Sequence, residues 1–165
     1  MPKVAVVMGS DSDLPVLEKA IDLLADFGIQ REVRVISAHR TPGAAVEFAK
    51  GAQRLGVEVI IAAAGKAAHL PGVLASLTTI PVIGVPVKSS FMDGLDSLLS
   101  MVQMPSGVPV ATVGINAGEN AALLAVQMLA LKYPELEEKL ARHRAEIADA
   151  VKEKDVRISG QMGGR

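Results

Sequence analysis

Short, almost continuous runs of aliphatic residues recur along this chain, and they limit its fold more than any other feature. The runs occupy residues 3–8, 33–37, 57–63, 81–87 and 108–113. A strand with apolar residues on both faces needs cover on both sides, which is typical of parallel sheets between helices. Each run is also shorter than an ordinary helix. The runs therefore predict five buried, parallel strands.

Helix-like segments separate the predicted strands. They cover residues 14–27, 42–55, 73–77, 95–102, 117–132 and 134–152. Alternation of strands with helices predicts a parallel sheet with helices on both faces. Five such strands favour a flavodoxin-like three-layer α/β/α sandwich with strand order 2-1-3-4-5. We expect one catalytic α/β domain over residues 1–154, including the C-terminal helix, and a polar, glycine-containing tail over 155–165.

Composition supports a globular domain and argues against several classes of function. Hydrophobic residues make up 50% of the 165 positions, which is enough for a sizeable core. A net charge of -1, with three Phe, one Tyr and no Trp, argues against nucleic-acid binding. No apolar run approaches the length of a membrane span, no signal peptide is evident, and cysteine is absent. We therefore expect a cytoplasmic protein without a membrane or nucleic-acid partner.

The segment 117–131, AGENAALLAVQMLAL, is apolar around most of the helix that it predicts. A helix on the surface of a monomer shows one apolar stripe and one polar face. Deep packing within its own domain would explain this pattern. In so small a chain, cover from a second subunit explains it better, so we expect a homo-oligomer.

The stretch ISAHRTP, residues 36–42, follows the second predicted strand. Ligands of open parallel α/β sheets bind at the carboxyl ends of the strands. Histidine is the residue type best suited to proton transfer at neutral pH, which makes His39 a candidate acid or base, and Arg40 suits a phosphate or a carboxylate. The pair indicates acid–base chemistry on an anionic substrate. The alternative is a histidine held in the loop by packing, with the arginine on the surface.

The turn after the first strand, GSDSD at residues 9–13, offers backbone N–H groups and two hydroxyls at a helix start. Phosphate binds readily in such places, and the carboxylates of Asp11 and Asp13 are suited to ribose hydroxyls. Ordinary helix capping by Ser and Asp explains the same residues. The glycine pattern of a dinucleotide-binding turn is missing.

The loop after the third strand, residues 62–72, combines small residues with His69. Small residues let a ligand approach the backbone closely, whereas a tightly packed crossover is the alternative. Residues 88–90 add a cation and two hydroxyls at the same edge of the sheet. His39, His69, Asp11 and Asp13 have no spacing typical of metal ligands, so we expect no metal site. His143, between two arginines, is expected on a solvated face.

Several of these stretches together resemble the class I N5-carboxyaminoimidazole ribonucleotide mutases of purine biosynthesis. The resemblance rests on GSDSD (9–13), SAHRTP (37–42), GKAAHLPG (65–72), PVIGVPV (81–87) and DSLLSMVQMPSGVPVAT (96–112). It implies a homo-octamer and a ribonucleotide substrate. It also implies transfer of a carboxylate, by way of CO2, from the exocyclic nitrogen to ring carbon C4, with neither metal nor organic cofactor.

The resemblance also implies roles for individual residues. His39 matches the general acid/base of the family. The substrate-binding positions that it implies are Ser10, Ser12, Asp13, Ser37, Arg40, Ala64, Gly65, Lys66, Ala67, His69 and Leu70. The small-residue loop through His69 matches the part that closes over the ring and the carboxylate. Lys66 stands where the family pattern carries a second glycine, and we expect it either to bind an anionic group or to point to solvent.

Two other functions are alternatives to the mutase activity. One is the related class II activity, a CO2-dependent carboxylase of aminoimidazole ribonucleotide, although the AAHLPG stretch resembles the mutases. The other is a non-catalytic nucleotide- or flavin-binding module. Flavin stacking favours an aromatic residue, and Phe91 is the one aromatic in the candidate loops.

Overall fold

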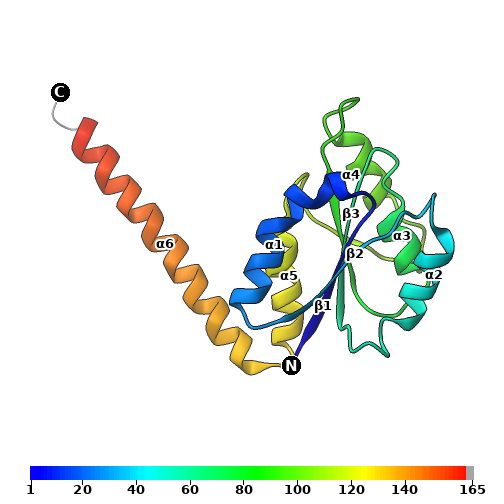
Figure 1. Ribbon diagram of the computed structural model, residues 1–165. Coiled ribbons are helices and arrows are strands. Elements are labelled where there is room, and N and C mark those ends of the chain that lie inside the picture. The colour runs from blue at the N-terminus through cyan, green and yellow to red at the C-terminus, as the bar shows by residue number, and fades with distance from the viewer. Residues whose placement is uncertain (163–165) are drawn as a thin grey trace.

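The computed structural model describes residues 1–162 and has a parallel sheet at its centre (Figure 1). Its strands are β1 (Lys3–Met8), β2 (Gln30–Val35), β3 (Val59–Gly65), β4 (Val82–Val87) and β5 (Ala111–Thr112). They lie in the order β2-β1-β3-β4-β5, and each neighbouring pair is parallel. The predicted five-stranded, flavodoxin-like sheet is confirmed.

Helices cover both faces of this sheet, which completes the predicted three layers (Figure 1). One layer holds α1 (Leu14–Asp26) and α5 (Gly118–Ala130), and α6 (Pro134–Met162) begins beside them. The other layer holds α2 (Pro42–Gly51), α3 (Leu70–Ala75) and α4 (Leu95–Val102). A short 3-10 turn, η1 (Asp11–Asp13), joins β1 to α1.

Strand β1 shows why both faces need cover. Val4, Val6 and Met8 pack among α1 and α5, whereas Ala5 and Val7 pack among α2, α3 and α4. None of the five side chains is more than 2% exposed. Since burying a residue such as valine stabilises a fold by about 1.5–3 kcal/mol, both layers contribute to holding the strand.

The helix α5 is largely covered within the chain itself. Gly118, its first residue, lies against α1, and a Cβ there would overlap the carbonyl oxygen of Val16. Ala121, Ala125 and Leu129 are buried in the cluster that includes residues of α1, α6 and the sheet. This packing supplies most of the cover that the sequence argument assigned to a second subunit.

Strand β2 differs from its prediction, because it lies at an edge of the sheet and pairs only with β1. It begins at Gln30 and ends at Val35, whereas the apolar run predicted a buried strand over 33–37. Val33 and Val35 are 43% and 58% exposed, and only Ile36, just past the strand, is buried. The prediction of a buried second strand is therefore wrong.

Strand β5 is shorter than the predicted 108–113. Only Ala111 and Thr112 pair with β4, opposite Ile83 and Gly84. Pro109 has no N–H to donate to the ladder, and prolines are found at edges or ends of strands for that reason. The apolar run therefore continues beyond the part that forms a strand.

Helix α6 extends away from the body of the molecule (Figure 1). It spans 29 residues, so residues 155–162 continue the helix where the sequence predicted a tail; residues 163–165 lie outside the described residues. The segment contains no proline after Pro134 and is rich in strong helix formers. No helix described within residues 1–162 combines the length and apolar character needed to cross a membrane.

His143 lies where α6 leaves the body, and it is half-buried rather than solvated as predicted. Its ring meets the edge of Phe27, with the centroids 5.8 Å apart. Its Nε2 atom is buried and has no hydrogen-bond partner among the described residues. The prediction that His143 lies on a solvated face is therefore wrong, although the two arginines beside it are exposed.

Candidate active site

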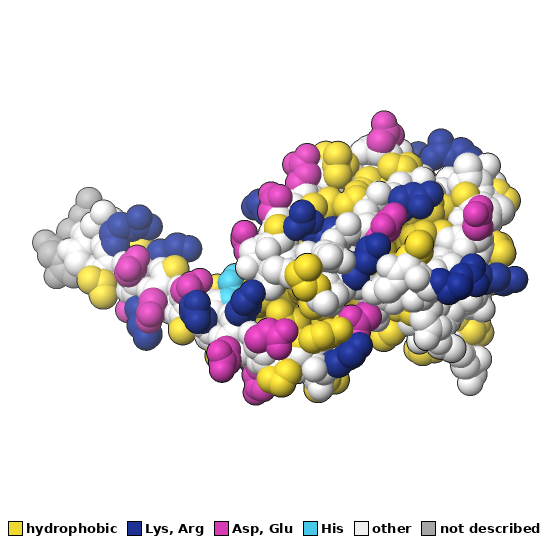
Figure 2. Space-filling model, turned by 60° about the horizontal axis from the view of Figure 1, so that its bottom comes forward, with side chains coloured by type: hydrophobic (Ala, Val, Ile, Leu, Met, Phe, Trp, Pro, Cys, Tyr) yellow, Lys and Arg dark blue, Asp and Glu magenta, His cyan; other side chains and the backbone are white. Residues whose placement is uncertain are grey.

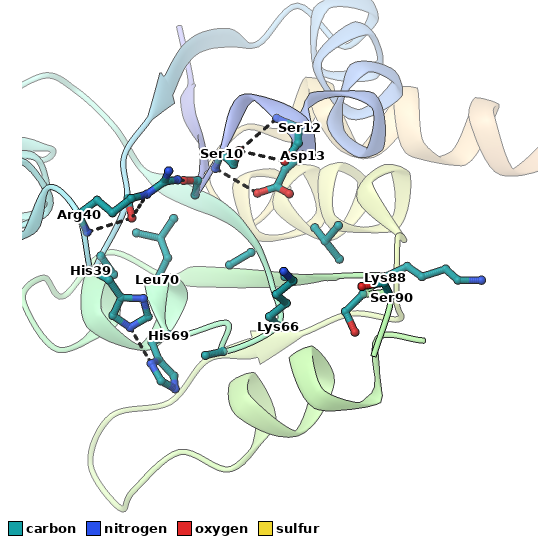
Figure 3. A pocket seen from close by; sticks show the side chains of 18 residues that line it. Ser10, Ser12, Asp13, His39, Arg40, Lys66, His69, Leu70, Lys88 and Ser90 are labelled. Atoms are coloured by element: carbon teal, nitrogen blue, oxygen red, sulfur yellow. Dashed lines mark hydrogen bonds between the residues drawn. The ribbon is translucent and has the colours of Figure 1, made fainter. Parts of the chain in front are cut away.

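A cavity of about 570 Å3 opens at the carboxyl edge of the sheet (Figure 3). Loops that follow β1, β2, β3 and β4 form its walls. His39 and all the substrate-binding residues implied by the resemblance line it: Ser10, Ser12, Asp13, Ser37, His39, Arg40, Ala64, Gly65, Lys66, Ala67, His69 and Leu70. Asp11, which the sequence also offered for ribose hydroxyls, is not among the lining residues. Four loops that are far apart in the sequence thus contribute to one site.

The turn after β1 is stabilised by its own side chains. Ser10 caps η1, and its hydroxyl accepts a hydrogen bond from the N–H of Ser12 at 3.4 Å. The carboxylate of Asp13 accepts one from the N–H of Ser10 at 3.2 Å, which closes a capping box. Capping is therefore real, and the same side chains also face the cavity.

Burial raises the pKa of the Asp13 carboxyl above its ordinary value, and the nearby charge of Asp11 adds to this effect. The backbone N–H groups of Ser10 and Gly9 oppose it. The ionised form of Asp13 therefore makes the fold less stable. A carboxyl group that lines a pocket although burial disfavours its charge is a candidate for ligand binding.

The turn after β2 is fixed by Ser37 and Thr41. Thr41 Oγ1 accepts from the N–H of Ser37 and donates to its carbonyl oxygen, each at 3.0 Å. The hydroxyl of Ser37 accepts from the N–H of Arg40 at 3.1 Å. Sequence reasoning missed Thr41, because its role lies in the shape of the turn and not in the pocket lining.

Arg40 ties this second turn to the first. Its Nη2 donates to the carbonyl oxygen of Gly9 at 3.2 Å, and its Nε contacts the Ser37 hydroxyl at 3.4 Å. The guanidinium is therefore held at the wall formed by the loops after β1 and β2 (Figure 3). Its remaining donors are suited to a phosphate or a carboxylate.

His39 and His69 are in direct contact, although they are 30 positions apart in the sequence. A distance of 2.9 Å joins His39 Nε2 to His69 Nδ1, and the rings meet edge to face. One of these nitrogens must donate and the other accept, so at least one ring is neutral. Besides the proton shared between the two rings, the pair can therefore give a proton to a ligand or take one from it.

The loop after β3 places Lys66, Ala67 and His69 at the pocket. Lys66 adopts a left-handed conformation with φ of 55°, so the lysine occupies the backbone geometry that a glycine would favour. Ala68 and Leu70 are buried beneath the loop in the core around α2 and α3. The loop is thus anchored from below and exposes its polar side chains above.

The loop after β4 closes the fourth side of the cavity. Val87, Lys88, Ser89 and Ser90 line it, as do Gly9 and Ala38 elsewhere. The hydroxyl of Ser89 is buried and donates to the carboxylate of Asp96 at 2.8 Å, which anchors the loop to α4. Residues 88–90 could be recognised in the sequence because they directly follow a predicted strand.

Known proteins resemble the chain over most of its length. A family model described as AIR carboxylase matches residues 3–150. The N5-carboxyaminoimidazole ribonucleotide mutase of Pyrococcus horikoshii is 58% identical, over 98% of this chain and 91% of its own. The chain belongs to the N5-carboxyaminoimidazole ribonucleotide mutase family.

Two further relatives place the N5-carboxyaminoimidazole ribonucleotide mutase family in a broader context. The mutase of Thermotoga maritima is 55% identical over 99% of this chain and 95% of its own. The crystal structure of Treponema denticola PurE superposes with a TM-score of 0.86 at 30% identity, covering 95% of this chain and 98% of that one. The resemblance predicted from the sequence is confirmed, and the mutase fold extends to a much more distant chain.

Proposed function

We propose that this protein converts N5-carboxyaminoimidazole ribonucleotide into 4-carboxyaminoimidazole ribonucleotide, a step of purine biosynthesis. The single observation that carries the proposal is the cavity that unites a histidine pair with an arginine and the Ser10–Asp13 turn. The mutases named above, at 55% and 58% identity over nearly the whole chain, support the same reaction. The protein acts as an isomerase on a small-molecule ribonucleotide.

The walls formed by the loops after β1 and β2 hold the ribonucleotide in this proposal. Arg40 and the hydroxyls of Ser10, Ser12 and Ser37 supply donors for the phosphate. The carboxyl group of Asp13 accepts hydrogen bonds from the ribose. The contacts that fix Arg40 before the ligand arrives reduce the entropy lost on binding.

The loop after β3 covers the aminoimidazole ring and the carboxylate. Its backbone at Ala64, Gly65 and Ala67 lets the ring approach closely, and Leu70 supplies an apolar wall. Such a wall excludes water and retains CO2 between the two half-reactions. His69 and Lys66 are the polar side chains of this loop that face the ligand.

His39 moves the proton. As an imidazolium it protonates the carbamate nitrogen, the bond from nitrogen to the carboxyl carbon breaks, and CO2 and the amine form. Ring carbon C4 then attacks the retained CO2 and forms the new carbon–carbon bond. The C4 proton returns to His39, so the enzyme ends in its starting protonation state. His69 orients the His39 ring through the 2.9 Å contact.

The proposal for His39 is tested by His39→Asn. We expect turnover of the carbamate substrate to fall at least about 1,000-fold, since the transfer needs this proton donor and acceptor. Binding of the ribonucleotide should persist within about threefold, because other residues hold it. His143→Gln is the matched control, since His143 lies on α6 outside the cavity. Turnover of His39→Asn within tenfold of the parent protein would refute the assignment.

We also propose a homo-octamer in the cytoplasm. Exposed apolar side chains support contacts between subunits: Leu95, Leu99 and Val102 form one stripe on α4, and Ile147, Val151 and Ile158 lie on α6. Figure 2 shows that helix standing clear of the body, with hydrophobic and charged side chains intermixed. Light scattering should give a mass near eight times 17.2 kDa, and a monomer would contradict the proposal.

A further inference from the structure

Lys66 has a backbone conformation that its residue type does not favour. Asp93 and Asn116, the other non-glycine residues of the range 1–162 with positive φ, are of types that adopt this region more readily. A side chain with a Cβ makes this left-handed conformation unfavourable, except in Asn and Asp. In this conformation the Lys66 side chain extends into the cavity, with His39 and His69 on one side and Ser90 on the other (Figure 3).

The charge of Lys66 is free for a ligand. Its ammonium group has no ion-pair or hydrogen-bond partner among residues 1–162. The other cations of the cavity are engaged: Arg40 donates to Gly9, and Lys88 pairs with Asp93 at 3.0 Å and points away from the cavity (Figure 3). An unpaired cation inside a pocket attracts an anionic group of the ligand.

The position of Lys66 decides between the two anionic groups of the proposed substrate. Arg40 and the seryl hydroxyls of the first wall account for the phosphate. Lys66 belongs to the same loop as His69, which contacts the proton-transferring His39. We propose that Lys66 binds the migrating carboxylate, both in the carbamate and in the C4-carboxylated product. This assignment rests on the proposed function and names the group that the cation serves.

The chemistry of the transfer predicts how Lys66 affects the rate. Its flexible stem can follow the carboxylate from nitrogen to C4, and its charge stabilises both carboxylated states. The intermediate CO2 is neutral and gains less from the cation. An interaction that stabilises substrate and product equally, but stabilises the states between them less, lowers KM and does not raise kcat. Removal of the charge should therefore raise KM and leave kcat unchanged or higher.

Two ribonucleotides that differ only in the carboxylate test the assignment. Calorimetry measures binding of 4-carboxyaminoimidazole ribonucleotide and of the uncarboxylated aminoimidazole ribonucleotide to the full chain. Lys66→Met should weaken binding of the carboxylated ligand about five- to tenfold, as loss of a partly exposed ion pair does. Binding of the uncarboxylated ligand should change less than about twofold. Lys66→Arg should keep the difference between the ligands.

Two control variants separate charge from backbone strain. Lys66→Gly removes the charge and relaxes the left-handed backbone, so it should lose the same selectivity as Lys66→Met. Lys19→Met removes an exposed lysine of α1 that does not line the cavity, and it should leave both affinities unchanged. Equal losses for both ligands, a loss in Lys66→Met but not in Lys66→Gly, or no loss at all would overturn the assignment. A parent protein that binds neither ribonucleotide would instead refute the proposed function.

Discussion

Two carboxyl groups at opposite edges of the sheet have opposite acid–base behaviour. At the carboxyl edge, burial raises the pKa of Asp13. At the amino edge, partial burial of Glu58 opposes its ionisation, but hydrogen bonds from Lys132 and Tyr133 outweigh burial and lower its pKa. Glu58 Oε1 accepts from the Tyr133 hydroxyl at 2.8 Å, and Oε2 pairs with Lys132 at 2.6 Å.

The difference separates a group that stabilises the fold from one that the fold tolerates. Glu58 ties the start of β3 to the end of α5, and its charge is matched by partners from the chain. Asp13 accepts only backbone N–H groups and lines the cavity, so its charge lacks a cationic partner among residues 1–162. Unmatched polar groups at a pocket are characteristic of sites that exchange stability for binding.

The largest expected effect on ribonucleotide binding at the carboxyl edge is that of Arg40→Met. Binding of the ribonucleotide should weaken roughly 30- to 100-fold, because charge-assisted hydrogen bonds to the phosphate are lost. The free energy of unfolding should change by less than about 0.5 kcal/mol, since the side chain is exposed. Calorimetry and urea unfolding measure the two quantities. Arg144→Met on α6 is the control. A similar loss of ribonucleotide binding in Arg144→Met would mean that the effect is not specific to the cavity.

Glu58→Gln should show the reverse pattern at the amino edge. We expect a loss of about 1 kcal/mol in the free energy of unfolding at neutral pH, after discounting for solvent screening, and an unchanged KM. Because the pKa of Glu58 is lowered in the fold, this contribution is present above its unfolded value of 4.5 and is lost as the pH falls through the folded value.

Urea unfolding at neutral pH and below about pH 4 tests this prediction for Glu58. The difference between Glu58→Gln and the parent protein should shrink at the lower pH. Glu138→Gln, on the exposed face of α6, should show no difference at either pH. A difference that stays constant with pH would mean that the Glu58 charge does not stabilise the fold.

Asp13→Asn should have the smallest effect on stability and should act in the favourable direction. The pKa of Asp13 is raised, so stability falls as the pH rises from the unfolded value of 3.8 through the folded value, and the cost is complete above it. The variant should therefore be at least as stable as the parent at neutral pH, with weaker ribonucleotide binding. Thermal unfolding and calorimetry check this, and a marked loss of stability would contradict it.

The sequence predicted best the strands that are buried on both faces and the helices whose ends are clearly marked. Helix α4 has the predicted limits, and β3 is buried on both faces as its apolar run indicated. Strand β2 was misjudged because its apolar residues lie at an edge of the sheet. The end of α6 was misjudged because its polar composition suits both a tail and an exposed helix.

The lining of the candidate site was predictable because strand ends meet at one edge of a parallel sheet. The contacts inside it were not. The distance between His39 and His69 depends on how two loops fold over different strands. The hydrogen bond from Arg40 to Gly9 depends on how the loops after β2 and β1 are placed relative to each other. Thr41 is hydrogen-bonded to Ser37 within one turn, yet its sequence position gives no sign of that role.

The most direct test of the account follows the migrating carboxylate. The purified protein is given N5-carboxyaminoimidazole ribonucleotide with an isotopic label in its carboxylate, in the presence of unlabelled bicarbonate. If the cavity retains CO2 between the two steps, the C4-carboxylated product carries the label, and His39→Asn forms no product. Unlabelled product, or turnover that requires bicarbonate, would contradict the proposed carboxylate transfer.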